Sequence, residues 1–337
     1  MKALVLKLSS FGDIVHSFPA LEVLSSIDGV EVYWVVDEAF RALLEGDPRI
    51  KRLIEVKKGH LKLLLKSFRW SFFLRGVREL ISALRVLDVD VLFDLQGDLK
   101  SALISLFIKS PVKLTFPDAS EGNPLLLKRV PSRPESVHVA ERYLDVIRFY
   151  FTNLSIPKAP FAGPHVPQEV RERVLRDYGE VLSRRVVALI PATTWSSRTW
   201  LLERWERLSK ALLDLGFYPV IIGGSDAMNF NIPGVLNLGG RLSLAEACAF
   251  LGMCTLAIGV DTGPTHLSAS LGIPTISLFG PTPPWRNSPW GPKVKVIHNL
   301  VGCNPCRRRS CPSKLCMLSI SVEEVLQAVN ELSPLAF

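Results

Sequence analysis

The sequence predicts an α/β protein of two Rossmann-like domains, each with a parallel sheet, facing a central cleft. An apolar run at 3–8 leads through the polar turn 9–13 into a helical pattern from Ile14. A second apolar run, at 255–260, leads through residues 261–266 into another helical pattern. A strand that enters a helix through a tight turn leaves backbone N–H groups exposed at the helix start, and these favour anions. Two such turns, far apart in the chain, indicate two domains that share one site.

Strand-like and helix-like segments alternate through both halves, which is typical of parallel sheets covered on both faces. In the first half, strands are expected at 3–8, 30–36, 91–95 and 112–116, and helices at 14–26, 75–86 and 137–150. In the second half, strands are expected at 186–190, 218–222, 235–238, 255–260 and 275–279, and helices at 202–215, 244–251 and from 267.

A proline-rich stretch separates the two halves. Residues 155–168 contain four prolines and form the best linker candidate. We therefore expect one domain at 1–160 and a second at 161–320. The remaining residues, 321–337, begin with Ser321 and Glu324 in capping-box spacing and form a helix that could pack back on the first domain.

Composition places the chain among globular proteins. It has 337 residues, 48% of them hydrophobic, and a formal net charge of +8. No run is long and apolar enough to span a bilayer, and the first residues lack a signal-peptide pattern, so we expect a cytoplasmic protein. Six cysteines in such a chain argue against a disulfide scaffold.

Much of the positive charge lies in one segment. Residues 51–78 contain nine Lys or Arg and one acid, Glu55, interleaved with Leu, Phe and Trp. This pattern is typical of a membrane-surface element or a clamp for an anionic lipid. It fits equally well a solvated helix whose apolar face packs on its own domain. No nucleic-acid-binding motif is present.

Two further patterns have a chemical and a structural interpretation. Cys303, Cys306, Cys311 and Cys316 form C-x2-C-x4-C-x4-C, which could hold zinc or an iron–sulfur cluster, but the spacing departs from common zinc motifs. We assign no metal and expect reduced thiols or a disulfide. Asp88 and Asp90 spell the DxD of metal-dependent glycosyltransferases, but they directly precede an apolar run and are better explained as a strand-entry loop.

Five motifs in order resemble the ADP-heptose:lipopolysaccharide heptosyltransferases, glycosyltransferase family 9, which have the GT-B fold. They are KLSSFGD at 7–13, DLQG at 94–97 with Lys100-Ser101, ATT at 192–194 with RTW at 198–200, VDTG at 260–263 with His266, and LFGPT at 278–282. Within the family, the chain most resembles heptosyltransferase I, which adds the first heptose to the Kdo region of the inner core.

This resemblance implies the roles of several residues. Asp13 would be the base that deprotonates the acceptor in an inverting transfer; its ordinary alternative is a helix N-cap. Arg198, where close relatives carry Lys, would neutralise the leaving ADP. The other donor-binding residues implied are Ser10, Gly12, Thr193, Thr194, Asp261, Thr262, Gly263 and His266. In the family, the Asp261 carboxylate faces heptose hydroxyls. No cofactor is implied, because ADP-heptose is a substrate.

The acceptor implied is an anionic glycolipid of the Kdo-lipid A type, so the enzyme would work at the inner face of the inner membrane. The candidate acceptor-binding residues are Lys57, Lys58, Lys62, Lys66, Arg69, Gln96 and Lys100. The first domain would then bind acceptor and the second the nucleotide sugar.

Two other functions remain open at this point. One is a GT-B transferase with another nucleotide sugar or acceptor, and the other is a non-catalytic glycolipid-binding relative. A dinucleotide oxidoreductase is disfavoured, because Gly223-Gly224 lacks the G-x-G-x-x-G pattern.

Overall fold

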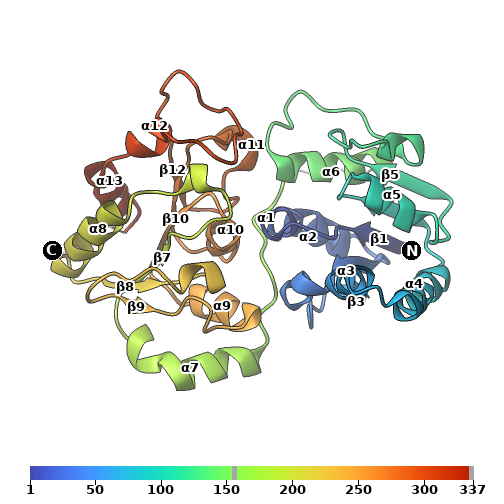
Figure 1. Ribbon diagram of the computed structural model, residues 1–337. Helices are drawn as coiled ribbons and strands as arrows, with labels where there is room; N and C mark the ends of the chain where they lie inside the picture. The colour runs from blue at the N-terminus through green and yellow to red at the C-terminus, as the bar shows by residue number, and fades with distance from the viewer. Residues whose placement is uncertain (154–157, 334–337) are drawn as a thin grey trace. The chain divides into compact units, whose positions relative to one another are not determined.

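The computed structural model describes residues 1–153 and 158–333, and of Leu61, Lys62 and Leu65 only the backbone. The chain divides into two compact units, Met1–Pro160 and Phe161–Phe337. Each unit contains one six-stranded parallel sheet with helices packed around it (Figure 1).

The sheet of the first unit has the strand order β3-β2-β1-β4-β5-β6, with every neighbouring pair parallel. Its strands are β1 (Lys2–Leu6), β2 (Glu31–Asp37), β3 (Ile50–Val56), β4 (Val91–Asp94), β5 (Val112–Thr115) and β6 (Lys128–Arg129). Its helices are α1 (Phe11–Val15), α2 (Phe18–Ser26), α3 (Lys58–Lys66), α4 (Trp70–Arg85), α5 (Leu99–Ser105) and α6 (Val139–Tyr150), with 3-10 turns η1 (Glu38–Leu43) and η2 (Asn123–Leu125).

The second unit repeats the same topology, with the order β12-β11-β10-β7-β8-β9. Its strands are β7 (Val186–Ile190), β8 (Tyr218–Ile221), β9 (Leu236–Asn237), β10 (Leu256–Val260), β11 (Thr275–Leu278) and β12 (Val294–Ile297). Its helices are α7 (Gln168–Leu182), α8 (Leu202–Asp214), α9 (Leu244–Leu251), α10 (Gly263–Ser270), α11 (Pro284–Asn287), α12 (Leu315–Leu318) and α13 (Val322–Leu332), with 3-10 turns η3 (Ser196–Arg198) and η4 (Ser225–Ala227).

This strand order creates one topological switch point in each sheet. In the first unit the chain runs outward from β1 to β3 and then returns to place β4 beside β1. In the second unit it runs outward from β7 to β9 and returns to place β10 beside β7. Open α/β sheets bind ligands beyond the carboxyl ends of the strands at such points. The loops after β1, β4, β7 and β10 are therefore the places to look for a site.

Each sheet is covered by apolar side chains of its own unit. In the first unit, Leu4 and Leu6 of β1 cluster with Leu92 of β4 and Leu84 of α4. In the second, the fully buried Trp205 of α8 packs in one cluster with the strands and with α13.

The last helix packs within the second unit. Helix α13 contacts α8, β11 and β12, and it buries Val322, Val325 and Val329 there. Its apolar face is thus occupied by its own unit.

The structure contains several elements that the sequence analysis did not name. They are the strands β3, β6 and β12 and the helices α3, α5, α7, α11 and α12. It also corrects the first helix, which was expected over 14–26. The helix begins earlier, at Phe11, and ends at Val15, and α2 starts separately at Phe18 with a proline in its first turn.

Candidate active site

Asp13 lies in the first turn of α1, directly after β1. Ser10 is the N-cap residue, and its backbone N–H and its Oγ donate to Asp13 Oδ2 at 3.1 and 2.9 Å. The alternative that Asp13 itself is the N-cap is wrong, because it occupies the third helical position and completes a capping box. Within the described chain, Asp13 Oδ1 has no hydrogen-bond partner and is the oxygen left to take a proton.

A buried lysine lies beneath this loop. Lys7 is 2% exposed, and its Nζ donates to the Leu95 carbonyl and to the Tyr143 hydroxyl, both at 2.9 Å. Burial lowers the pKa of Lys7, and the charges of Asp13, Asp94 and Asp98 act against that shift. Burial therefore favours the neutral form of Lys7, and the three carboxylates favour its charged form.

Gln96 fixes the loop that leads to Asp13. Its Oε1 accepts the backbone N–H groups of Leu8 and Ser9 at 3.1 and 3.0 Å, and its Nε2 donates to Asp98 at 3.3 Å. The sequence analysis expects Gln96 to contact the acceptor. In the structure its carboxamide joins the loop after β4 to the loop after β1.

The turn that carries Gln96 is itself anchored by a buried carboxylate. Asp94 Oδ1 accepts the backbone N–H groups of Gln96 and Gly97, and its Oδ2 accepts Ser101 Oγ and Asn123 Nδ2. Burial raises the pKa of Asp94, and these hydrogen bonds counter the shift. The anchor makes the switch point of the first unit rigid.

Gly97 is required in this turn. Its φ is +70°, and a Cβ at this position would lie 2.3 Å from the Phe116 ring and 3.1 Å from Ala119 Cα. Both the conformation and the space exclude a side chain.

In the second unit, the carboxylate of Asp261 gathers three side chains at the carboxyl ends of β7, β10 and β11. His266 Nε2 lies 3.1 Å from Oδ1, the Thr282 hydroxyl donates to Oδ2, and Arg198 Nη2 lies 3.3 Å from Oδ2. Arg198 Nη1 also donates to the Asp261 carbonyl at 2.9 Å. The carboxylate therefore faces protein partners here, where the family resemblance implied sugar hydroxyls.

Asp261 is ionised through this network. Burial raises its pKa, but the hydrogen bond and charge of His266, the charge of Arg198 and the Thr282 hydroxyl outweigh burial, so the pKa lies below its ordinary value. A buried, ionised carboxylate of this kind fixes the direction of the Arg198 guanidinium.

Arg198 is also held from the side by an aromatic ring. Its guanidinium carbon lies 3.9 Å from the centroid of the Trp195 ring, and that of Arg309 lies 5.4 Å from the same centroid. Ser197 ties the two segments together, because its N–H donates to the Arg309 carbonyl and its Oγ to the Arg308 carbonyl. The loop around 308–309 thus supports the turn that carries Arg198.

Helix α10 begins directly after Asp261, with Thr262 as the N-cap residue. Its close approach to β10 depends on Gly259, where a Cβ would lie 2.2 Å from Thr265 Oγ1 and 2.9 Å from Ile190 Cβ. Thr262 and Gly263 are partly exposed at this helix start. The helix N-terminus and Arg198 together form an anion-binding corner.

The remaining predicted donor residues lie at the same two switch points. Thr193 and Thr194 follow β7; Thr193 is half-buried and Thr194 is exposed. Ser10 ends the loop after β1 as the N-cap residue of α1, and Gly12 lies in the first turn of that helix. His266 is buried, and its Nε2 contacts the Asp261 carboxylate. The sequence analysis missed Thr282 and Trp195 as site residues. Thr282 had a signal, since it ends the motif at 278–282, whereas Trp195 had none.

Comparison with known proteins identifies the family. Residues 77–317 match the family described as glycosyltransferase family 9 (heptosyltransferase). The chain belongs to this family.

Its curated relatives are heptosyltransferases, and the chain aligns with two of them over most of their length. The chain is 29% identical to lipopolysaccharide heptosyltransferase 1 of Pseudomonas aeruginosa over 92% of this chain and 87% of the relative. It is 27% identical to lipopolysaccharide heptosyltransferase 1 of Escherichia coli K12 over 90% and 97%. The structure of E. coli heptosyltransferase WaaC with ADP superposes with a TM-score of 0.77 at 24% identity, covering 99% of this chain and all of that one. The predicted GT-B fold of two parallel-sheet units is confirmed.

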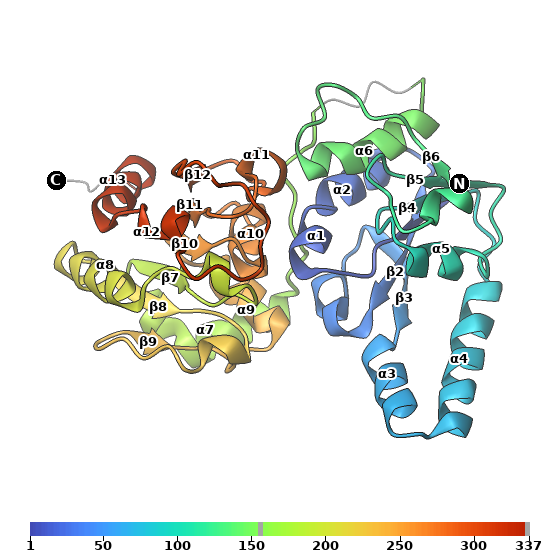
Figure 2. The ribbon, with the colours of Figure 1, turned by 45° about the horizontal axis from the view of Figure 1, so that its top comes forward.

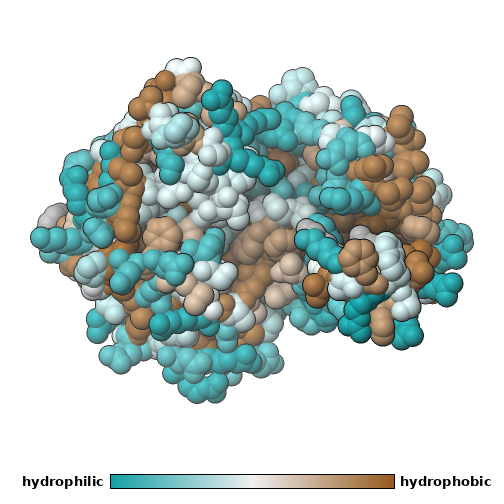
Figure 3. Space-filling view, viewed as in Figure 1, coloured by the Kyte–Doolittle hydropathy of each residue, from teal (hydrophilic) through white to brown (hydrophobic). Residues whose placement is uncertain are grey.

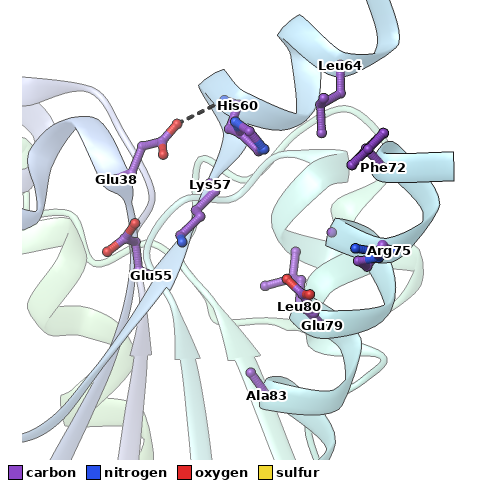
Figure 4. A pocket seen from close by; sticks show the side chains of 11 residues that line it. Glu38, Glu55, Lys57, His60, Leu64, Phe72, Arg75, Glu79, Leu80 and Ala83 are labelled. Carbon is purple, nitrogen blue, oxygen red and sulfur yellow. Dashed lines mark hydrogen bonds between the residues drawn. The ribbon is translucent and has the colours of Figure 1, made fainter. Parts of the chain in front are cut away.

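The basic segment of this heptosyltransferase, residues 51–78, forms most of β3, the helix α3 and the first part of α4. Lys57 lines a cavity of about 620 Å³ between this segment and η1 (Figure 4), together with His60, Arg75 and the carboxylates Glu38, Glu55 and Glu79. The cavity therefore carries both signs of charge. Lys58 Nζ lies 3.8 Å from Asp37 Oδ2.

The other predicted acceptor residues lie on the surface. Lys66 and Arg69 are exposed near the turn between α3 and α4, and Lys100 is exposed at the start of α5. The side chain of Lys62 lies outside the described part of the structure. Along 1–153 and 158–333, no helix combines the length and hydropathy needed to cross a bilayer.

The cysteine loop lies beside the donor half of the site. All six cysteines are free thiols. Burial raises the pKa of the Cys316 thiol. The hydrogen bond with Ser313 lowers the pKa of the Cys311 thiol. Among the side chains that the structure describes, no group of three or more His, Cys, Asp or Glu is arranged to hold a metal.

The DxD residues are structural, as the sequence analysis expected. Asp88 pairs with Lys109 at 2.6 Å, and Asp90 accepts the backbone N–H of Lys2 at 2.7 Å. Both lie before β4, at the edge of the sheet opposite the switch point.

Proposed function

We propose that this enzyme transfers L-glycero-D-manno-heptose from ADP-heptose to the Kdo region of the lipopolysaccharide inner core, with inversion. The observation that carries the proposal is the fixing of Arg198 by Asp261 beside the start of α10, at the switch point of the second unit. Two relatives named lipopolysaccharide heptosyltransferase 1 and the ADP complex of WaaC support the same donor and acceptor.

The diphosphate of the donor binds at the start of α10. The backbone N–H groups of Thr262 and Gly263 meet its oxygens, because the N-terminal donors of a helix have no partners within the helix. Arg198 neutralises the charge that develops as the bond between the sugar C1 and the phosphate oxygen breaks and its electron pair leaves with ADP. Thr193 and Thr194 position the same group.

Asp13 is the base for the acceptor. Its Oδ1 takes the proton of the acceptor hydroxyl as that oxygen attacks C1 on the face opposite ADP, which inverts the anomeric configuration. The capping bonds from Ser10 hold Oδ2, and Gln96 holds the approach loop, so the carboxylate is oriented before substrate arrives.

An anionic acceptor of the Kdo-lipid A type binds through the basic segment. Lys57, Lys66 and Arg69, with Lys58, Lys62 and Lys100, supply cations for its phosphates and carboxylates. We propose that the enzyme is cytoplasmic and works peripherally at the inner face of the inner membrane, where such an acceptor is presented.

The reaction needs no metal in this proposal, because Arg198 and the helix start meet the diphosphate charge. Activity is then expected to be the same after dialysis against EDTA and after later addition of Mg²⁺. An activity that falls with EDTA and returns with Mg²⁺ would contradict this part of the proposal.

The function is tested by offering the purified chain ADP-heptose, ADP-glucose and UDP-glucose with Kdo-lipid A, and by measuring the mass of the lipid product. We expect a mass increase of one heptose with ADP-heptose alone. Transfer from another nucleotide sugar would keep the fold and change the donor. Donor binding without acceptor modification would support the non-catalytic alternative.

A further inference from the structure

Helices α3 and α4 form a hairpin that extends away from the sheet of the first unit (Figure 2). The turn between them is tight: Ser67 donates its N–H to Leu63, Arg69 donates to Leu64, and Phe68 has a positive φ of 54°. The hairpin is fixed at its base, where Leu84 of α4 enters the core of the unit. Among the described side chains of α4, Leu84 is the one that is buried.

The free end of the hairpin exposes large apolar side chains. Leu63 is 64% exposed, Phe68 79% and Trp70 54%, and Phe72 and Leu74 are exposed as well. The space-filling view shows hydrophobic and hydrophilic side chains intermingled over α3 and α4 (Figure 3). The expectation that the apolar face packs on its own domain is therefore wrong for this end of the segment. Five neighbouring residues of this kind indicate an interaction surface.

The hairpin is also strongly cationic, and its free end carries Lys66 and Arg69. Between residues 57 and 78 the sequence has seven Lys or Arg and no Asp or Glu. Two of the arginines lie against an exposed ring, since the guanidinium carbons of Arg69 and Arg75 are 4.5 and 5.6 Å from the centroid of Phe72. Their charged heads therefore lie over the face of this ring, and all three side chains remain exposed at the surface.

We propose that the tip of this hairpin, residues 63–74, is a membrane-docking element that inserts Phe68 and Trp70 into an anionic bilayer. Aromatic and aliphatic side chains with a collar of Lys and Arg are what an interfacial element requires, and tryptophan favours the headgroup level. The cations are attracted to the negative potential of an anionic surface.

The positive charge of the tip favours an anionic bilayer over a protein partner. A protein surface would have to be both acidic and apolar to match it, whereas an anionic bilayer offers headgroup charge above a hydrocarbon layer. A tip of two aromatic side chains reaches the interface and does not span it, so binding is reversible and sensitive to salt.

The inference rests on the proposed function, because a glycolipid acceptor places the enzyme at a membrane. It goes further, since it predicts that docking needs no acceptor. The experiment is sedimentation of the full chain with vesicles of phosphatidylglycerol and phosphatidylethanolamine that contain no Kdo-lipid A. We expect binding to these vesicles, little binding to phosphatidylcholine vesicles, and release as salt is raised.

The decisive variant is Phe68→Ser with Trp70→Ser, which is expected to weaken vesicle binding at least tenfold. Its matched control is Leu125→Ser with Leu300→Ser, which removes two side chains that are 89% and 75% exposed outside the hairpin and is expected to bind as the native chain does. Lys66→Glu with Arg69→Glu is a second variant that tests the cations, again with weaker binding expected.

Three results would overturn the proposal: equal binding by the Phe68/Trp70 variant and the native chain, equal binding to neutral vesicles, or binding only when Kdo-lipid A is present. The last result would make the tip an acceptor contact. Transfer of heptose to a water-soluble acceptor without acyl chains is measured in parallel. This activity is expected to persist in the Phe68/Trp70 variant, so a failure of docking and a failure of the proposed reaction are distinguishable.

Discussion

The orientation of the Arg198 guanidinium depends on two groups of Asp261, its backbone carbonyl and its carboxylate. Its Nη1 binds the Asp261 carbonyl, and its Nη2 lies next to the carboxylate. A planar guanidinium can satisfy both at once, while an ammonium is a single point of charge. The arginine at this position is therefore matched to its surroundings.

Replacing Arg198 by lysine tests that match. Arg198→Lys is expected to raise the dissociation constant for ADP-heptose about tenfold, because the fork to Asp261 and the stacking on Trp195 are both lost. Titration calorimetry measures this change. The control is Arg207→Lys, at a surface pair with Glu323. Equal affinity in the native chain and Arg198→Lys would show that charge alone is needed.

Gln96 is a positioning residue for the loop before Asp13. Gln96→Ala leaves the N–H groups of Leu8 and Ser9 without their acceptor, so we expect kcat to fall about tenfold with little change in the KM for ADP-heptose. Gln168→Ala, at an exposed hydrogen bond to Glu172, is the control. A rise in the acceptor KM with kcat unchanged would instead assign Gln96 to acceptor binding, as its sequence motif suggested.

Acid is expected to lower the stability of the second unit, because it protonates Asp261. Its pKa is lower in the folded chain than the ordinary value of 3.8. The folded state therefore binds fewer protons between these two values, so the stabilisation is complete above about pH 4 and is lost as pH falls through the folded-state pKa. Melting temperatures from pH 7 to 2.5 should fall less steeply for Asp261→Asn than for the native chain. Asp88→Asn, at an exposed pair, is the control, and identical slopes for Asp261→Asn and the native chain would contradict the account.

For single residues, the sequence patterns predicted position better than contacts. The motifs placed Asp13, Arg198, Asp261 and His266 after strands, and the structure has them there. The contacts of Asp261 could not be predicted, since Thr282 and Arg198 reach it from two other strand ends that only the folded sheet brings together. Trp195 lies in a 3-10 turn region without periodicity, so no pattern marked it.

Among the elements, β10 and α10 show how a single glycine sets a packing distance. Helix α10 lies close to β10 because Gly259 has no Cβ. An added methyl group would meet the Thr265 hydroxyl and Ile190, neither of which has room to move in a fully buried layer. The anion-binding start of α10 therefore depends on this position.

Gly259→Ala is expected to destabilise the chain by about 1–3 kcal/mol, measured by urea unfolding, and to weaken donor binding. Gly179→Ala is the matched control: nothing lies within 4 Å of its Cβ position in α7. A helical glycine replaced by alanine gains about 0.5–1 kcal/mol. Equal stability of Gly259→Ala and the native chain would show that the helix can shift without cost.

The elements that sequence analysis missed share a physical cause. Strand β3 carries Lys51, Arg52 and Glu55 on its exposed positions and was absorbed into the basic segment. Helix α7 buries Val174 and little else among its described side chains, so its apolar stripe is weak. The strands β7 and β10 were placed almost residue for residue, because all five side chains of each are buried and their apolar runs are uninterrupted.

For the whole molecule, the repeated strand order explains why candidate site residues occur on both units. Each switch point presents two loops at the carboxyl edge of its sheet, with Asp13 and Gln96 on the first unit and Arg198 and Asp261 on the second. The sequence predicted this organisation because its motifs follow strand ends in order. The boundaries of the units followed from the prolines between them.

The charge of the molecule is also unevenly distributed. The hairpin of α3 and α4 holds most of the net positive charge in a segment that contributes little to either core. Such a separation is expected when a segment is retained for binding an anionic partner and the units around it carry stability.

The measurement that tests the account most directly compares heptose transfer by the native chain and Asp13→Asn, with ADP-heptose affinity measured on the same samples. Asparagine can still accept the hydrogen bonds of Ser10 at Oδ1, so folding and donor affinity are expected to stay unchanged, while kcat falls by about 10²–10⁴-fold because the base is lost. Near-native turnover by Asp13→Asn would contradict the assignment of Asp13 as the base.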